Sequence, residues 1–295
     1  MSDAIIEVVD LCHTYMKGTP LARQALTKVN LTIDRGELVA IIGRTGSGKS
    51  TLIQHFNGLL KPDSGTVRVA GSDIWARGVS LRDVRRKVGL VFQYPEHQLF
   101  EETVEADISF APRSLGMTPV QVEEAVREAM RTVDLDFDAL RDRSPFELSG
   151  GQKRRVAIAG VLAMGPEILV LDEPTAGMDP RGRDEVLEEI MALHKEHGYT
   201  IVLVSHSMED VARFAQRLIV MDGGTVAMQG SPCDVFRQRD ALVKMGLGVP
   251  QVTDLMAELA SKGYEVPDDV VTIEEALGVL RPLLIGAAPR RGDSQ

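Results

Sequence analysis

The sequence predicts an α/β fold built around a mostly parallel sheet, and three observations support this. Short, nearly all-apolar runs at residues 37–42, 168–171 and 200–204 suit strands that are buried on both faces. A charged segment of helical character, Arg181 to His197, separates the second run from the third, which is the alternation of a βαβ unit. The 295 residues, 44% of them apolar, can form one large domain, or one domain plus an appendage.

Two regions interrupt this pattern. Residues Ile5 to Tyr15 and Ala25 to Ile33 mix β-branched and polar side chains, which predicts antiparallel strands near the N-terminus. Between about Pro95 and Pro166 the apolar residues recur at helical spacing. We therefore expect an N-terminal antiparallel β subdomain and, at about residues 95–166, an inserted helical subdomain.

The last part of the chain is predicted to form a small, mostly helical appendage. Gln251 to Lys262 and Ile273 to Leu284 have the spacing of amphipathic helices, and a polar tail runs from Pro289 to Gln295. We expect a main domain over residues 1–240 and the appendage over residues 241–295.

Composition limits the possible locations and partners. No stretch approaches the roughly 18 consecutive apolar residues that a membrane-spanning helix needs, and the N-terminus has no secretory signal pattern. Cys12 and Cys233 have no metal-ligand or redox spacing, so we expect reduced thiols without a chemical role. The net charge of −10 opposes binding to nucleic acid or anionic lipid. These features favour a chain that stays in the cytoplasm and binds other proteins.

A glycine-rich motif follows the apolar run at residues 37–42 and precedes a predicted helix. It satisfies the P-loop pattern GxxxxGK[ST], in which backbone N–H groups and the helix N-terminus bind phosphates. Lys49 is expected to reach the β- and γ-phosphates, and the Ser50 hydroxyl to ligate Mg²⁺. The motif therefore predicts a site for ATP and Mg²⁺. The candidate ATP-binding residues of this motif are Gly43, Arg44, Thr45, Gly46, Ser47, Gly48, Lys49, Ser50 and Thr51.

Two carboxylates end the apolar run that begins at Ile168. A strand end is where an open α/β sheet places its ligands. Asp172 suits the Mg²⁺ coordination shell, and Glu173 is placed to orient and deprotonate an attacking water. With the P-loop in the same chain, this pair predicts hydrolysis of the bound nucleotide.

A third motif, LSGGQ at residues 148–152, comes directly before a helix-like run. Ser149 is expected to cap that helix, and the glycines permit close approach of another backbone, which makes a second anion-binding helix terminus. LSGGQ between a P-loop and a strand that ends in DEP resembles the ATP-binding-cassette (ABC) ATPases, over residues 1 to about 240. The resemblance implies the P-loop NTPase fold of that family.

The same resemblance implies roles for residues that carry little information alone. Tyr15 would stack on adenine, Gln93 would sense Mg²⁺ and a membrane subunit, His206 would contact the γ-phosphate, and Asp179 would be the D-loop residue. Two cassettes pair head to tail in this family, so a monomer is expected to be nearly inactive. The signature residues that would act on the nucleotide of the partner cassette are Ser149, Gly150, Gly151 and Gln152.

The stretch VFQYPEHQLF at residues 91–100 and the run LSGGQKRRVAIAG are similar to the ATPases of energy-coupling factor (ECF) transporters and related cobalt and nickel importers. Residues 18–25 are most similar to the second of the two ATPases of that family. This resemblance implies a second ATPase, identical or different, a transmembrane coupling subunit, and a small membrane subunit that captures a vitamin or metal ion. The chain would then bind peripherally at the cytoplasmic face of the membrane.

Acidic residues gather beside Gln93, where ABC ATPases receive a coupling helix. We expect them to meet basic residues of the membrane subunit, which would raise the association rate and fix the register. The alternative is a solvated acidic surface. The four residues are Glu96, Glu101, Glu102 and Glu105.

Two other functions compete with an ECF ATPase. A soluble ABC protein of DNA repair or translation usually has a long coiled-coil insertion or two cassettes, and this acidic chain has neither. The ATPase subunit of a conventional ABC importer or exporter is the stronger alternative. The stretch QLF at residues 98–100 and the C-terminal appendage favour the ECF type.

Overall fold

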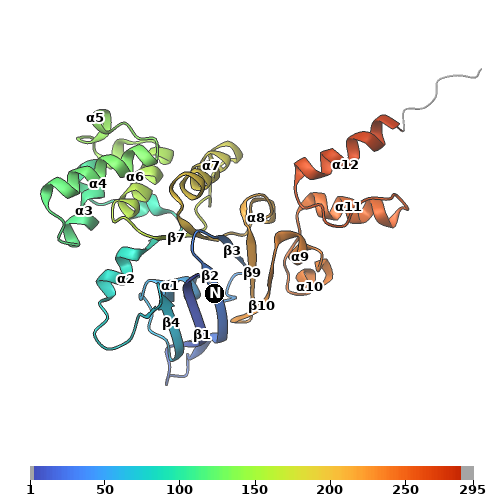
Figure 1. Cartoon of the computed structure of the whole chain (residues 1–295), viewed down its shortest axis with the longest axis horizontal. Coiled ribbons are helices and arrows are strands. Elements are labelled where there is room, and N and C mark those ends of the chain that lie inside the picture. The colour runs from blue at the N-terminus through green and yellow to red at the C-terminus, as the bar shows by residue number, and fades with distance from the viewer. Residues whose placement is uncertain (1–2, 287–295) are drawn as a thin grey trace, which may run out of the picture.

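A computed structural model of the chain describes residues 3–286, so the predicted polar tail from Pro289 to Gln295 lies outside the described residues. Its centre is a six-stranded sheet in the order β10-β9-β3-β8-β7-β6 (Figure 1). All neighbouring strands pair in parallel except β10, which is antiparallel to β9. The α/β prediction is confirmed. The strands are β3 (Leu38–Ile42), β6 (Val88–Val91), β7 (Ile168–Asp172), β8 (Thr200–Val204), β9 (Arg217–Asp222) and β10 (Thr225–Gly230).

The central strands are apolar because both of their faces are covered. Every residue of β3, β7 and β8 is buried. Along β3 the side chains alternate between two cores: Leu38, Ala40 and Ile42 belong to one, and Val39 and Ile41 belong to the other. This alternation follows from the two-residue period of a strand. The sheet is therefore rigid, and its carboxyl edge is a fixed platform for the loops that follow.

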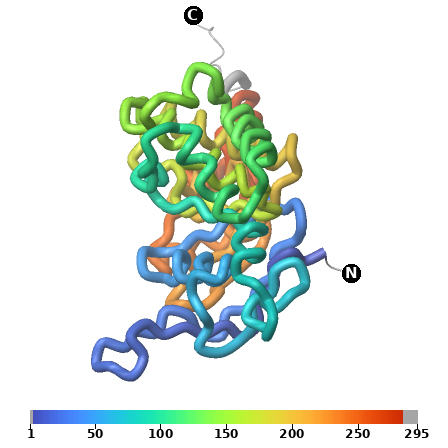
Figure 2. Tube along the Cα trace, turned by 90° about the vertical axis from the view of Figure 1, so that its left-hand side faces the viewer, coloured from blue at the N-terminus to red at the C-terminus, as the bar shows by residue number. Residues whose placement is uncertain are grey.

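A second, antiparallel sheet forms the N-terminal subdomain, in the order β2-β1-β4-β5. It shares a core with one face of the central sheet, because side chains of β1, β3 and α1 (Lys49–Phe56) all enter the same apolar cluster. Figure 2 shows this sheet and the helical region at opposite ends of the molecule. The strands are β1 (Ala4–Tyr15), β2 (Arg23–Asp34), β4 (Ser64–Val69) and β5 (Ser72–Asp73), followed by helix α2 (Leu81–Lys87).

A buried histidine gives this core a dependence on pH. His55 on α1 has no exposed surface, and its Nδ1 is 2.7 Å from the carbonyl oxygen of Thr51. Burial is the main reason that the pKa of His55 falls from an ordinary 6.5 to about 4, and the nearby His13 lowers it further. Because the folded state disfavours the protonated ring, the contribution of His55 to stability is complete above pH 6.5 and is lost as the pH falls toward 4.

Between pH 7.5 and pH 5, protonation of His55 in the unfolded chain is expected to reduce the free energy of unfolding by about 2 kcal/mol. His55→Phe, which keeps an aromatic ring but does not titrate, should be less stable at pH 7.5 and should lose about 2 kcal/mol less on acidification. Urea unfolding at the two pH values measures the difference. Identical losses in wild type and variant would show that His55 does not cause the pH dependence.

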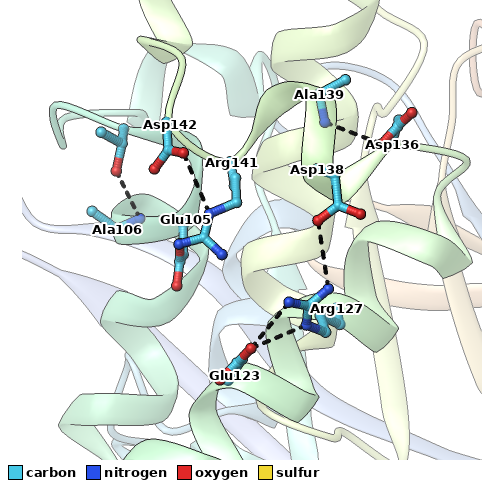
Figure 3. A network of polar contacts seen from close by, with 10 residues as sticks. Glu105, Ala106, Glu123, Arg127, Asp136, Asp138, Ala139, Arg141 and Asp142 are labelled. Atoms are coloured by element: carbon cyan, nitrogen blue, oxygen red, sulfur yellow. Dashed lines mark hydrogen bonds and ion pairs between the residues drawn. The ribbon is translucent and has the colours of Figure 1, made fainter.

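Helices and short turns between β6 and β7 form the region that the sequence predicts as a helical insertion. Apolar side chains of α3, α4 and α6 join one core of the central sheet. Figure 3 shows ion pairs that hold this region, among them Arg127 between Glu123 and Asp138. The elements are η1 (Pro95–Gln98), α3 (Val104–Ser114), α4 (Pro119–Thr132), α5 (Phe137–Leu140), η2 (Pro145–Glu147) and α6 (Gly150–Leu162).

The C-terminal helices α11 and α12 project from the end of the central sheet (Figure 1) and match the two predicted amphipathic helices. They enclose a small core of their own, with Met256, Val270 and Ala276. No helix in residues 3–286 is long and apolar enough to cross a membrane. The helices after β7 are α7 (Pro180–His197), α8 (Met208–Phe214), α9 (Pro232–Phe236), α10 (Arg239–Lys244), α11 (Gln251–Ser261) and α12 (Ile273–Gly286).

Candidate nucleotide site

The P-loop connects the carboxyl end of β3 to the N-terminus of α1. Two of its glycines have backbones that other residues rarely adopt: φ is +154° at Gly43 and +104° at Gly48, the residue before the helix. A β-carbon at residue 43 would lie 2.3 Å from the carbonyl oxygen of Met221, and one at residue 48 would lie 2.7 Å from that of Ala25. The loop therefore takes its shape only with glycine at both positions.

Lys49 shapes the inside of this loop. The ammonium group donates hydrogen bonds to the carbonyl oxygens of Gly43 at 2.7 Å and of Arg44 at 3.1 Å. The residue is 5% exposed. Burial lowers the pKa of Lys49, while the carboxylates of Glu173 and Asp172 act in the opposite direction. A buried cation thus lies beside backbone N–H groups and a helix N-terminus, which is an arrangement that binds anions.

The two acids at the end of β7 have different surroundings. Asp172 is 8% exposed, and burial raises the pKa of its carboxyl group. A hydrogen bond from Ser50 and the charge of Lys49 oppose that rise. A divalent cation beside Asp172 would also favour the ionised carboxylate.

Glu173, the next residue, makes the contacts expected of a catalytic group. Its Oε1 is 2.6 Å from Nε2 of His206, and its Oε2 accepts a hydrogen bond of 3.2 Å from Nε2 of Gln93. Its φ of +51° is unusual for a residue with a side chain and turns it out of the strand direction. The three predicted catalytic residues come from the ends of three different strands, β6, β7 and β8. The structure thus brings them together.

These groups open on one cavity of about 590 Å³. Tyr15 is at its edge, with its hydroxyl 3.2 Å from Oγ1 of Thr51. Two lining residues, Arg23 and Ala25, are not among those identified from the sequence; Ala25 begins the predicted strand at residues 25–33, whereas Arg23 lies outside it. The lining consists of Tyr15, Arg23, Ala25, Thr45, Gly46, Gly48, Lys49, Ser50, Thr51, Gln93, Glu173 and His206.

Four predicted site residues belong to the loop or strand but do not line the cavity. The backbone carbonyls of Gly43 and Arg44 bind Lys49, and Asp172 lies behind Ser50. Ser47 is 4% exposed, with no hydrogen-bond partner for its hydroxyl in the described part of the chain.

The signature residues are elsewhere, at the N-terminus of α6. Ser149 and Gln152 form a reciprocal capping box: Ser149 Oγ accepts from the Gln152 N–H, and Gln152 Oε1 accepts from the Ser149 N–H. A β-carbon at Gly150 or Gly151 would meet nothing within 4 Å, so this surface is open to an approaching molecule. Asp179 caps α7 through a 2.9 Å hydrogen bond from Gly182. None of these residues lines the cavity of their own chain.

Arg154 connects α6, the helix that begins in the LSGGQ motif, to two other segments: the turn η1 and the loop that follows Glu173. Arg154 on α6 is 2% exposed, and its Nε is 3.2 Å from Oε2 of Glu96 in η1. Its Nη2 also donates to the carbonyl oxygen of Ala176, which precedes Asp179. Arg154 therefore contacts both η1 and the segment after Glu173 from the signature helix.

This contact corrects part of the expectation for the acidic cluster. Glu96 pairs with Arg154, and Glu105 pairs with Arg141 at 3.0 Å (Figure 3). Both carboxylates therefore already have a basic partner within the chain. In the described part of the chain, Glu101 and Glu102 have no ion pair, so the hypothesis narrows to these two residues.

Residues 26–176 match a protein family described as "ABC transporter". The chain belongs to this family. It is 55% identical to the energy-coupling factor transporter ATP-binding protein EcfA2 of Clostridium tetani, over 92% of this chain and 94% of that protein. It is 54% identical to the protein of the same name from Symbiobacterium thermophilum, over 93% and 94% of the two chains.

Solved ABC structures have the same fold. The protein cbiO1 of Clostridium perfringens, part of the ABC transporter complex cbiONQ, is 38% identical and superimposes with a TM-score of 0.72, covering 87% of this chain and all of that one. A dimeric ATP-binding cassette in a post-hydrolysis state, bound to ADP and Pi, is 30% identical with a TM-score of 0.67, covering 77% of this chain and 98% of that one. The ABC ATPase fold is thus shown for this chain.

Proposed function

We propose that this chain is the ATP-hydrolysing subunit that energises an ECF-type importer for vitamins or transition-metal ions. The observation that carries the ATPase activity is the placement of Glu173, hydrogen-bonded to Gln93 and His206, on the same cavity as the P-loop. The ECF assignment rests on relatives of that name, which are similar over more than nine tenths of both chains.

In the proposed mechanism, positioning and charge stabilisation supply most of the catalysis. Tyr15 stacks on adenine, and the P-loop N–H groups and Lys49 hold the phosphates. Glu173 accepts a proton from the attacking water, while Gln93 and His206 hold that carboxylate and the γ-phosphate region in place.

The residues present fit Mg²⁺. Ser50, Asp172 and Gln93 offer a hydroxyl, a carboxylate and an amide oxygen, which are the hard oxygen ligands that Mg²⁺ prefers. The described residues hold no group of three or more His, Cys, Asp or Glu side chains that would form a closed metal cage. When bound, Mg²⁺ neutralises charge that develops on the phosphates.

We further propose that two cassettes pair head to tail, so that Ser149, Gly150, Gly151 and Gln152 of one chain cover the nucleotide of the other. The open helix N-terminus at Gly150 supports this arrangement, because a β-carbon there would meet no atom of the described residues within 4 Å. Asp179 would lie at the same interface. Closure on ATP and reopening after hydrolysis would then move the membrane subunit.

We propose that the main domain ends at about residue 240 and that it contains a helical subdomain at about residues 95–166. Helix α10 (Arg239–Lys244) runs across that position, and Leu242, Leu247 and Val249 pack into the main core. The helices with their own core begin at α11. We propose that this C-terminal unit helps to hold the ATPase pair together.

Mass spectrometry of the proteins that co-purify with the tagged chain from membranes in mild detergent tests the function. The proposal predicts a second ATPase, identical or different, a transmembrane coupling subunit and at least one small membrane protein, which then identifies the substrate class. Within this complex the chain itself should be peripheral, at the cytoplasmic face of the membrane, and the complex should be free of nucleic acid. A pair of large permease subunits instead would make the chain an ATPase of a conventional ABC transporter.

We expect Glu101 and Glu102 to attract basic residues of the coupling subunit. Reversal of both charges, Glu101→Lys with Glu102→Lys, should slow association about tenfold at low ionic strength, and less in high salt because charges are screened. Surface plasmon resonance against the coupling subunit measures the rate. The matched control reverses Glu124 and Glu196, which are exposed and lie outside this cluster. Equal association rates for both double variants would eliminate the proposed contact.

A further inference from the structure

Arg23 lies where the N-terminal sheet meets the P-loop. It is directly opposite Tyr15 in the antiparallel pairing of β1 with β2, and both residues line the cavity. From there its side chain reaches the glycine turn of the P-loop: Nη2 is 3.1 Å from the position that a β-carbon at residue 46 would occupy. Arg23 therefore extends from the adenine end of the cavity to the phosphate end.

Its guanidinium is available to a ligand. Arg23 is exposed, and in the described part of the chain its side chain has no hydrogen bond or ion pair. Arg68, which is in the same sheet, differs because it pairs with Glu7 at 2.8 Å. A free guanidinium beside a phosphate-binding loop is suited to bind a ligand, because an arginine fork readily binds carboxylates and phosphates with two hydrogen bonds.

The second cation of the cavity is used differently. Lys49 is buried, and its ammonium group is fixed by the carbonyl oxygens of Gly43 and Arg44. It approaches the phosphates from inside the loop, next to Glu173 and Asp172. Arg23 approaches from the outer side, at Gly46. A polyphosphate held by the P-loop would thus lie between two cations from different parts of the fold.

We infer that Arg23 is a further nucleotide-binding residue, whose guanidinium contacts the β-phosphate of ATP or ADP at Gly46. The inference rests on the nucleotide site proposed above. It predicts that Arg23 distinguishes nucleotides with a β-phosphate from AMP. It also gives the N-terminal β subdomain a direct contact with the phosphates, in addition to the stacking of Tyr15 on the base.

Isothermal titration calorimetry on the full chain tests this. Arg23→Ala should raise the Kd for both ATP and ADP about tenfold, which corresponds to about 1.4 kcal/mol. Arg23→Lys, which keeps a point charge but loses the fork, should raise it about threefold. The affinity for AMP, measured by competition with ADP, should change less than about twofold. The matched control is Arg77→Ala, which removes an exposed arginine from the same subdomain away from the cavity.

The possible outcomes distinguish a failure of the Arg23 inference from a failure of the proposed nucleotide site. If Lys49→Met weakens ATP binding in the same assay but Arg23→Ala binds ATP like wild type, Arg23 is not a ligand contact and the P-loop site stands. If AMP affinity falls as much as ATP affinity, the β-phosphate assignment is wrong. If the wild-type chain itself binds neither ATP nor ADP in this assay, the proposed nucleotide site fails. Because Arg23 has no internal partner, the melting temperature without nucleotide should be unchanged in Arg23→Ala.

Discussion

Glu173→Gln is expected to lower the rate of ATP hydrolysis by at least about a hundredfold, while ATP still binds. A positioned general base contributes about 10²- to 10⁴-fold to a rate, and an amide cannot accept the proton of the attacking water. The substitution preserves the size of the side chain, and its oxygen can still accept the hydrogen bond that Gln93 donates. The loss is therefore expected in the chemical step, with little change in the fold.

The second consequence of Glu173→Gln is a trapped dimer. Since reopening follows hydrolysis in the proposed mechanism, ATP should hold the variant in a closed pair that size-exclusion chromatography with light scattering detects. Phosphate release measured in the assembled complex gives the rate. Glu196→Gln, an exposed position on α7, is the control and should behave like wild type. If Glu173→Gln turned over ATP as fast as wild type, Glu173 would not be the general base.

The central sheet could be predicted because burial on both faces leaves a direct trace in the sequence. Each residue of β7 and β8 is buried, and each run is apolar except for one polar residue at its end, Asp172 or Thr200. The P-loop was equally clear, since glycine is the only residue that fits at Gly43 and Gly48. In both cases the information is local, because it lies within a few consecutive residues.

What could not be predicted depends on contacts between distant residues. The charges of Glu96 and Glu105 suggested a docking surface, because nothing in the pattern shows that Arg154 and Arg141 neutralise them. Arg23 was missed for a similar reason: its position across from Tyr15 depends on the register of β1 and β2, which contains several irregularities. Charge pairing and strand register are set by tertiary packing, which sequence spacing does not encode.

The start of helix α6 could be predicted only in part from the sequence. The sequence placed an N-cap at Ser149, and the structure has the full capping box, with α6 beginning at Gly150. Gly150 and Gly151 occupy the first turn of this helix, although glycine weakens a helix. The cap and the contacts of Arg154 outweigh that cost, and they leave the two glycines exposed in the first turn, where a second chain can approach them.

Lys49→Met is expected to weaken ATP binding about 30- to 100-fold, or about 2–2.5 kcal/mol. The variant loses a charge-assisted contact with the phosphates, a class of hydrogen bond worth about 1.5–3 kcal/mol. It also loses the bonds that Lys49 donates to Gly43 and Arg44, which hold the loop in shape. Met has a similar length and suits the buried position, so the fold should be retained. Calorimetric titration with ATP measures the affinity.

The control for Lys49→Met is Lys195→Met, which removes an exposed lysine far along α7 and should bind ATP like wild type. The two substitutions at the site also separate binding from chemistry. Glu173→Gln should retain affinity and lose turnover, whereas Lys49→Met should lose affinity first, and turnover with it. A Lys49→Met variant that bound ATP normally but failed to hydrolyse it would mean that Lys49 acts only in the transition state, and that the P-loop backbone and helix N-terminus alone supply the ground-state affinity.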